Sequence, residues 1–325
     1  MALMGNKKEE HLPPPVLELS IITVNYKSAD HLIECLRSIK ENLKNLEYEI
    51  IVIDNASGDR SVGKIQAAFS DIVLIENKTN LGFSKANNQG IRRSRGRYIL
   101  LLNNDTVVLP NALEAMVGVL KRSADIGIVG CRLLNPDKTP QQSFGSAAGF
   151  IGDLLQSTFS NTLFANSSNP IVEKILARLH RSGKKVGWVC GACMLCRRDS
   201  LEETGLLDEN FFMYKEDMDL CISFRKKNWG IYYTPDAPII HHLGASVSAK
   251  PFETAIEYRK SQLYFYKKHY GWMGLLCLKI YLYGKFIRKL SVSFLVDCAG
   301  EPSSGNGQDS YSLNREILKV IRDFH

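Results

Sequence analysis

The stretch YILLLNNDT, residues 98–106, decides the class of fold. Five apolar residues, Tyr98 to Leu102, predict a buried strand, and two amides and a carboxylate follow it at once. The carboxyl ends of strands in parallel sheets are where α/β proteins bind ligands. No cation neighbours Asp105 in the sequence, so its carboxylate suits Mg²⁺ or Mn²⁺ holding a diphosphate. The same residues also suit a plain turn, because Asn and Asp favour turns.

Apolar strands alternate with amphipathic helices on both sides of this stretch. The pattern predicts strands over 19–25, 49–54, 72–75, 98–102 and 126–134, and helices over 29–42, 61–69, 82–93 and 110–122. Further along it predicts a strand over 187–196, helices over 198–204 and 216–227, and short strands over 230–233 and 239–242. Such alternation is typical of parallel βαβ units in a three-layer α/β fold, here expected over residues 19–135, within a domain that spans residues 18–250.

Two regions differ in composition from this domain. Residues 135–185 are rich in Ser, Asn, Gly and Phe, with one helical stretch over 171–180, and predict a mobile insertion. Residues 251–325 predict a helical, basic and apolar carboxyl-terminal extension, with a linker over 300–307 and a last helix over 313–323.

Length and charge exclude several classes of protein. A chain of 325 residues with 45% hydrophobic and 23% charged residues suits a soluble protein with one large domain and an appendage. A net charge of +7 suits an anionic ligand or membrane surface, but no nucleic-acid-binding module is visible. Residues 1–17 are polar and predict a flexible lead-in rather than a signal peptide. No run of about 18 uncharged apolar residues predicts a membrane-spanning helix, so we expect a cytoplasmic protein.

Three of the eight cysteines form overlapping CxxC units at Cys190, Cys193 and Cys196. A zinc site would require a second ligand pair at matching spacing. The three thiols lie in an apolar run, 186–196, which favours buried, reduced cysteines and a reducing compartment.

Four polar clusters lie where predicted strands end or helices begin. The first, Asp54 to Asp59, could accept hydrogen bonds from a base or a ribose, or could cap a helix. In the second, Asn80 to Gly90, Gly82 permits a close backbone approach and Asn87 and Asn88 could line a pocket. The third is Asn103 to Asp105, and the fourth is Tyr214 to Asp219, followed by His241 and His242.

The fourth cluster carries most of the expected chemistry. Acidic residues at a helix start are stabilised by the helix dipole, whatever their function. Here the aromatic and apolar residues 211–214 precede them, and such surroundings can raise the pKa of a carboxylate toward that of a general base. One of the two histidines could be a metal ligand.

Together and in order, these motifs resemble the family 2 glycosyltransferases with a GT-A fold. The motifs are LSIITVNY (19–26), VIDNASGD (52–59), NLGF (80–83), LLNND (101–105), GA (191–192) and EDMDLC (216–221). The chain is most similar to the rhamnosyltransferase-like branch that builds bacterial cell-surface polysaccharides. The resemblance covers residues 18–248.

The resemblance implies a donor site and a metal site. The implied donor-binding residues are Thr23, Asn25, Asp54, Gly82, Asn87, Asn104 and Asp105. Asp54 matches the acidic residue that contacts the nucleotide base. Residues 103–105 match the DxD-type motif, although Asn103 replaces its first aspartate. Asp105 and His241, with His242 as the alternative, would hold Mg²⁺ or Mn²⁺.

The resemblance also implies a base and an acceptor site. Asp217 matches the catalytic base, and Trp188, Gly191, Ala192 and Glu216 would line the acceptor site. The implied reaction is one inverting displacement from a nucleotide-sugar donor, dTDP-rhamnose by similarity, with UDP- and GDP-sugars as alternatives. The acceptor would be a saccharide or a lipid-linked saccharide.

The extension offers a second kind of contact. In residues 272–296, basic side chains interrupt an apolar stretch, as in an interfacial helix on the anionic inner face of the plasma membrane. A helix packed on the core with a solvated basic face has the same pattern.

Two other functions compete with this interpretation. A nucleotidyltransferase would have a glycine-rich loop with Arg or Lys after its first strand, but residues 25–28 contain no glycine. A non-catalytic scaffold would be favoured if Asp105 or Asp217 were missing, and both are present.

Overall fold

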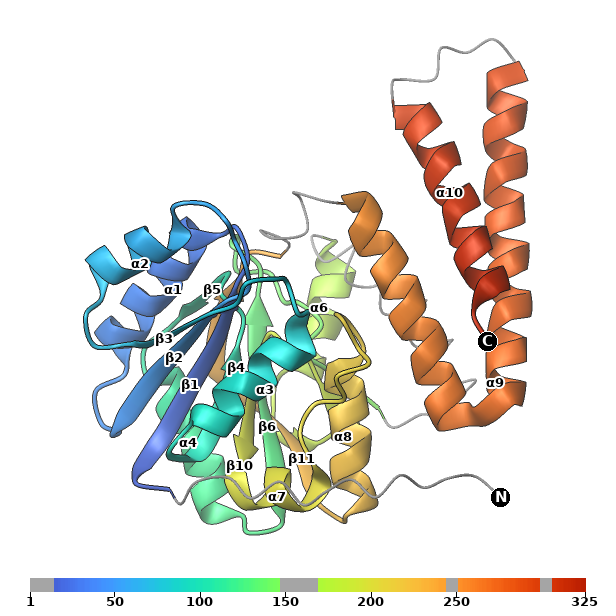
Figure 1. Cartoon of the computed structure of the whole chain (residues 1–325). Coiled ribbons are helices and arrows are strands. Elements are labelled where there is room, and N and C mark those ends of the chain that lie inside the picture. Colours follow the sequence, from blue (N-terminus) through green and yellow to red (C-terminus); the bar gives the residue numbers. More distant parts are fainter. Residues whose placement is uncertain (1–14, 147–168, 244–250, 299–305) are drawn as a thin grey trace. The chain divides into compact units, whose positions relative to one another are not determined.

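The computed structural model describes residues 15–146, 169–243, 251–298 and 306–325 (Figure 1). The chain forms two compact units. The first comprises Met1–Asn210 and Glu216–Ser246, and the second comprises Phe211–Lys215 and Val247–His325. Most of the predicted lead-in lies outside the described residues. Parts of the predicted insertion and of the predicted linker lie outside them too.

One mixed sheet forms the centre of the first unit. Its strands lie in the order β3-β2-β1-β4-β10-β6-β11-β5, and β8 pairs with β11. The bounds are β1 Leu17–Asn25, β2 Tyr48–Asp54, β3 Val73–Glu76, β4 Gly96–Leu102, β5 Thr106–Val108, β6 Ile126–Leu134, β8 Lys184–Lys185, β10 Cys193–Arg197 and β11 Gly230–His241.

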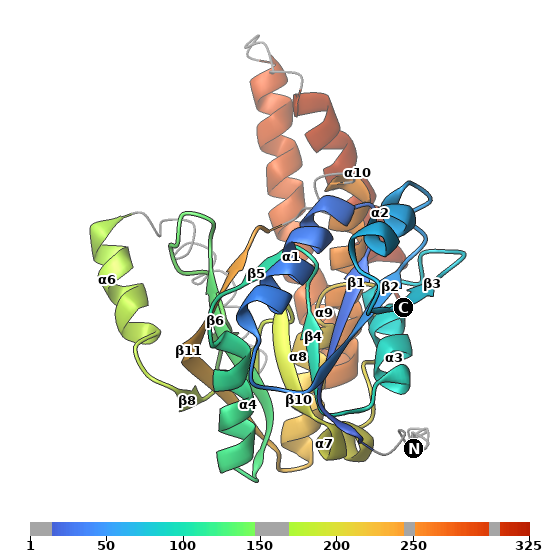
Figure 2. The same ribbon diagram turned by 90° about the vertical axis from the view of Figure 1, so that its left-hand side faces the viewer.

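Helices cover both faces of this sheet (Figures 1 and 2). On one face, β1 buries Leu19 and Ile21 in a core shared with α1 (Ala29–Asn42), α2 (Ser61–Ala68) and α4 (Ala112–Arg122). On the other, Ile22 packs in a core shared with α3 (Phe83–Arg93), α7 (Arg198–Thr204) and α8 (Glu216–Lys226). Successive strand residues point to opposite faces, so a strand covered on both sides is apolar throughout. The prediction of a three-layer α/β domain is confirmed.

β10 and β5 run against their neighbours in the sheet. β10 lies between β4 and β6 and runs antiparallel to both, and β5 runs antiparallel to β11. The parallel βαβ units predicted over residues 19–135 do not include these two strands, because β10 lies beyond that range and no strand is predicted over 106–108. Because β10 is reversed, its first residue, Cys193, pairs with Leu102, the last residue of β4. The residues just before β10 thus reach the edge where β4 ends.

The later strands also differ in extent from the prediction. The predicted strand over 187–196 is divided into β9 (Trp188–Val189) and β10 by a turn. The two short strands predicted over 230–233 and 239–242 form one strand, β11, with an irregular pairing to β6 between Tyr233 and Pro238. β9 pairs with β7 (Phe144–Gly145) in a separate two-stranded sheet, and α6 (Pro170–Leu179) lies between these two strands in the sequence.

The second unit is helical. α9 (Pro251–Cys298) consists of two helical segments that meet at a kink at Gly271, where φ is 66°. Its second segment packs on α10 (Asn306–Asp323), and Leu278, Leu282 and Ile321 are fully buried. Within the described ranges, no helix is long and apolar enough to cross a membrane.

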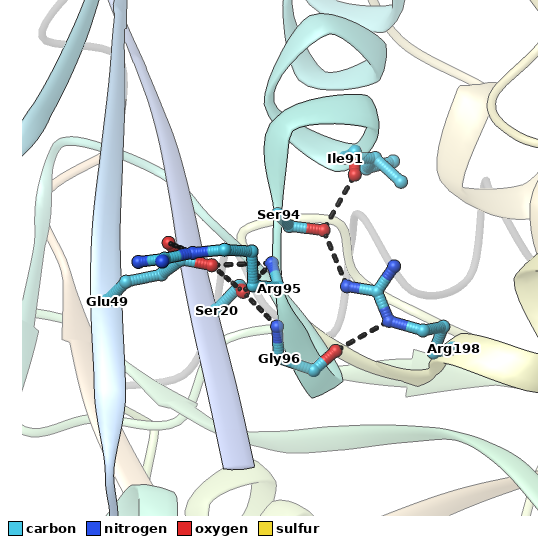
Figure 3. Close-up of polar contacts among 7 residues, drawn as sticks. All are labelled: Ser20, Glu49, Ile91, Ser94, Arg95, Gly96 and Arg198. Carbon is cyan, nitrogen blue, oxygen red and sulfur yellow. Dashed lines mark hydrogen bonds and ion pairs between the residues drawn. The ribbon is translucent and has the colours of Figure 1, made fainter. Parts of the chain in front are cut away.

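A polar network joins the amino ends of the central strands (Figure 3). The Ser20 hydroxyl donates to Glu49 Oε1 over 2.6 Å and accepts from the Gly96 amide over 2.7 Å. The buried Arg198 guanidinium donates to the Gly96 carbonyl and to Ser94 Oγ over 2.7 and 2.9 Å. Because these groups are buried, each lost partner would leave an unsatisfied polar atom in the core.

Glycine is required at the centre of this network. A Cβ at Gly96 would lie 2.3 Å from the Ser20 backbone nitrogen. We predict that Gly96→Ala lowers the free energy of unfolding by about 1–3 kcal/mol, because two strands would have to separate. Chemical denaturation of purified protein measures this change.

Gly63 provides the matched control. It lies in α2, and a Cβ there would meet nothing within 4 Å. Gly63→Ala should leave stability unchanged or raise it by up to about 1 kcal/mol, since alanine favours helix. Equal stability of the two variants would contradict the role given to Gly96.

Candidate active site

The polar clusters of the first unit meet at one edge of the sheet because parallel strands end together. β1 pairs with β2 so that Asn25 lies opposite Asp54, and each is the last residue of its strand. β4 flanks β1 on its other side and ends at Leu102, directly before residues 103–105.

Asp54 is buried and held by three hydrogen bonds. Its Oδ1 accepts from Asn25 Nδ2 over 2.9 Å and from Ser57 Oγ over 2.6 Å, and its Oδ2 accepts from the Ser57 amide over 3.0 Å. Ser57 was not among the predicted site residues. The three-residue spacing from Asp54 is a local turn signal that could have indicated it.

Asn55 brings the loop containing Gly82 to the same place. Its Nδ2 donates to Asn80 Oδ1 over 2.8 Å and to the Gly82 carbonyl over 3.3 Å, and its Oδ1 accepts from the Leu81 amide over 3.0 Å. Gly82 has a φ of 83°, which strains any residue with a Cβ. Asn55 was also absent from the predicted site, although it follows Asp54 directly.

Two predicted donor-binding residues are buried next to this edge. Thr23 lies two residues before the end of β1, and its Oγ1 has no hydrogen-bond partner among the described residues. Asn87 lies inside α3, and its Nδ2 donates to the Phe83 carbonyl over 2.9 Å.

The segment after β4 contacts both Asn25 and the end of β11. Asn104 Nδ2 donates to Asn25 Oδ1 over 3.3 Å. Asp105 Oδ1 lies 3.3 Å from His241 Nε2, and Asn103 Nδ2 lies 3.5 Å from the same nitrogen. β5 and β11 pair so that His241 is opposite Thr106, which accounts for this proximity.

The two adjacent histidines point to different neighbours. The His241 side chain faces Asp105, and both side chains are only 8% exposed. The His242 ring lies 5.4 Å from the His31 ring, and its Nε2 lies 3.9 Å from Glu34 Oε2 on α1. Successive residues of a strand alternate in direction, so only one of the two side chains can face Asp105.

Asp217 joins this edge through the turn between β9 and β10. The Gly191 amide donates to Asp217 Oδ2 over 3.0 Å, and the Ala192 carbonyl accepts from the Asn103 amide over 2.9 Å. Asp217 is in the first turn of α8. A Cβ at Gly191 would lie 3.1 Å from Asp217 Cβ, so glycine permits the close approach. Trp188 in β9 precedes this turn, and Glu216 precedes Asp217 and is buried.

The cysteines in and after this turn are free thiols. Cys193 and Cys196 are buried in β10. Loss of hydration, with the nearby Asp217 charge as a second cause, raises the pKa of Cys190 to about 12. A thiol with such a pKa stays protonated at neutral pH.

The arrangement offers two ligand atoms for a divalent cation. Asp105 Oδ1 and His241 Nε2 face each other in a buried position, and carboxylate and imidazole ligands suit Mn²⁺, with the carboxylate also suiting Mg²⁺. Among the described residues, no three His, Cys, Asp or Glu side chains form a group that could hold a metal by themselves. Oxygen atoms from a diphosphate would have to complete the coordination.

Comparisons with known proteins identify the family. The sequence profile described as Glycosyl transferase family 2 matches residues 20–205, more than half of the chain. The chain belongs to glycosyltransferase family 2. The predicted membership and the predicted glycosyltransferase activity are confirmed, and the nucleotidyltransferase and scaffold alternatives are not supported.

This glycosyltransferase is similar to two named relatives and to one solved structure. It is 24% identical over 266 residues to an N-acetylglucosaminyl-diphospho-decaprenol L-rhamnosyltransferase of Mycobacterium tuberculosis, covering 78% of this chain and 86% of the relative. It is 28% identical over 235 residues to the low-salt glycan biosynthesis hexosyltransferase Agl10 of Haloferax volcanii, covering 69% and 67%.

The solved structure is the mannosyltransferase PcManGT of Pyrobaculum calidifontis in complex with GDP-Man and Mn²⁺. It aligns with a TM-score of 0.55 and 14% identity over 97% of this chain and 90% of that one. The likeness supports the predicted GT-A fold of this family 2 glycosyltransferase.

Proposed function

We propose that this glycosyltransferase transfers rhamnose from dTDP-rhamnose, with inversion and with a divalent metal, to a saccharide or lipid-linked saccharide. One observation carries the proposal. An unbroken series of contacts runs from Asp54 through Asn25 and Asn104 to Asp105 and His241. From Asn103 it continues through the turn at Gly191 and Ala192 to Asp217.

The first half of this series suits a nucleotide diphosphate. Asp54 presents a fixed carboxylate, and the neighbouring Asn55 side chain donates to the Gly82 carbonyl and so holds that loop close by. Asp105 and His241 would hold Mg²⁺ or Mn²⁺, which would stabilise the negative charge of the departing nucleoside diphosphate. Asn103 stands where a DxD motif has its first carboxylate, so His241 would supply the second protein ligand atom.

The second half suits proton removal. Asp217 would accept the proton of an acceptor hydroxyl as that oxygen attacks the anomeric carbon. Its Oδ2 is held by the Gly191 amide and its Oδ1 by the Met218 amide, which orient the carboxylate. Trp188, Gly191, Ala192 and Glu216 would line the acceptor side of this carboxylate.

The choice of donor rests on the relatives. The Mycobacterium protein is named as an L-rhamnosyltransferase, which favours dTDP-rhamnose, whereas the PcManGT complex contains GDP-Man, which keeps UDP- and GDP-sugars as alternatives. The decaprenol-linked substrate in the Mycobacterium name supports a lipid-linked acceptor.

A lipid-linked acceptor gives the second unit a function at the inner membrane surface. Beyond the kink, α9 exposes large apolar side chains, namely Trp272, Met273, Leu276, Ile280 and Ile287. From Tyr258 to Val296 the chain has no Asp or Glu but eight Lys and Arg, at 259, 260, 267, 268, 279, 285, 288 and 289. Exposed apolar residues whose charged neighbours are all cations favour the headgroup region of anionic lipids.

We predict that dTDP-rhamnose binds in calorimetry more tightly than UDP- and GDP-sugars, and more tightly with Mn²⁺ than without. Asp105→Ala and His241→Gln should each weaken the Mn²⁺-dependent binding by at least ~10-fold, because each removes one of two protein ligand atoms. His242→Gln is the matched control and should bind as the wild type does. If a UDP- or GDP-sugar binds most tightly, dTDP-rhamnose is not the donor. Unchanged binding in Asp105→Ala would refute the metal site.

Asp217→Asn keeps the shape of the side chain and removes its basicity. We predict that donor affinity is preserved while the transfer rate falls ~10²–10⁴-fold. Donor affinity is measured by calorimetry and transfer by release of nucleoside diphosphate in the presence of acceptor. Near-normal turnover would show that another group is the base.

Ile280→Glu tests the membrane surface. We predict that binding to vesicles containing phosphatidylglycerol weakens ~10-fold or more, since a charge replaces an apolar side chain at the contact. Tyr311→Glu on α10 makes the same change of charge at another exposed position and should bind as the wild type does. Co-sedimentation measures vesicle binding by both variants. Equal losses of binding would contradict the proposed contact at Ile280, because they would mean that only net charge matters.

A further inference from the structure

Gln141 is a buried residue beside the proposed metal ligands that the sequence did not indicate. It follows β6 in a tight reversal of the chain, in which the Asn135 amide donates to the Thr139 carbonyl over 2.8 Å. The Gln141 amide donates back to the Leu133 carbonyl over 2.9 Å. Since β6 pairs with β11, this reversal brings Gln141 to the end of β11, where His241 lies.

The orientation of the Gln141 side-chain amide follows from its partners. Nε2 lies 2.6 Å from the His241 backbone carbonyl and 2.8 Å from Asn135 Oδ1. A backbone carbonyl can only accept a hydrogen bond, so the NH₂ group must face it. The other end of the amide, Oε1, then faces His241 Nδ1 at 3.0 Å.

This contact determines which ring nitrogen of His241 carries the hydrogen. An amide oxygen can only accept, so Nδ1 must donate to it. In the neutral ring, Nε2 then carries the lone pair, and it lies 3.3 Å from Asp105 Oδ1 and 3.5 Å from Asn103 Nδ2. The Nε2 lone pair and the Asp105 carboxylate oxygen are both atoms that a divalent cation between them would bind.

We propose that Gln141 is a positioning residue that keeps His241 in the Nδ1–H tautomer and directs the Nε2 lone pair toward Asp105. The inference rests on the proposed metal site and adds the residue that prepares it before any metal binds. Metal-binding histidines commonly donate their other N–H to an acceptor, which sets the ring orientation and strengthens the ligand.

The reversal itself holds Gln141 in place. Asn135 accepts from Gln141 through Oδ1 and donates through Nδ2 to Thr139 Oγ1 over 2.8 Å. Thr139 in turn donates from its amide and hydroxyl to Asp137 Oδ1 over 2.9 and 2.6 Å. The hydrogen bonds that hold Gln141 against His241 therefore all come from one short segment, residues 135–141.

The test measures the tautomer directly in metal-free protein. With ¹⁵N-labelled histidine at about pH 8.5, where an ordinary histidine is neutral, NMR distinguishes protonated from unprotonated ring nitrogens. His241→Gln assigns the signal by its loss. We expect the wild type to show protonated Nδ1, and Gln141→Leu to lose this preference. Gln142→Leu, at the half-buried neighbouring position, is the control and should keep it.

A second readout is Mn²⁺ affinity in the presence of nucleoside diphosphate. We expect Gln141→Leu to weaken it ~10–100-fold and Gln142→Leu to leave it unchanged. An unchanged tautomer in Gln141→Leu, with or without lower stability, would overturn the proposal. If the tautomer responds but His241→Gln binds Mn²⁺ normally, Gln141 still orients His241 and the proposed metal site is what fails.

Discussion

The site depends on the parallel pairing of β1 with both β2 and β4. This pairing ends three strands at one edge and places Asn25 between two polar segments that are far apart in the sequence. Asn25 is fully buried, and its amide donates to Asp54 while its oxygen accepts from Asn104. A one-residue slip of β1 would turn Asn25 to the opposite face and separate Asp54 from Asn104 and Asp105.

The opposite edge of the sheet keeps this pairing in register. Ser20, Glu49, Gly96 and Arg198 form a buried network there, which joins β1, β2, β4 and α7. Gly96 allows the backbones of β1 and β4 to come close, and Arg198 satisfies the polar groups that this approach buries. The two edges thus have different tasks. The amino ends carry a stabilising polar network, and the carboxyl ends bring together the polar residues that we propose bind ligands.

The second unit includes a short segment from the middle of the chain. Phe211–Lys215 belongs to that unit, and Ser261 Oγ on α9 donates to the Met213 carbonyl over 2.7 Å. The Phe211 and Tyr264 rings also pack, 4.9 Å apart. Tyr214 and Lys215 both have positive φ, which is a costly conformation for residues with side chains. Within the second unit, α9 therefore helps to maintain the conformation of residues 211–215.

The sequence by itself determined the alternation of strands and helices, the strand ends that carry polar residues, and the family, since these depend on local periodicity and motif order. Tertiary structure decided the direction of β10, which no periodicity encodes, and thereby brought Gly191 to Asp217. It decided that His241 rather than His242 faces Asp105, because the register of β11 selects the face of each side chain. It also revealed Gln141, whose proposed role depends on a hydrogen bond to His241, 100 positions away in the sequence.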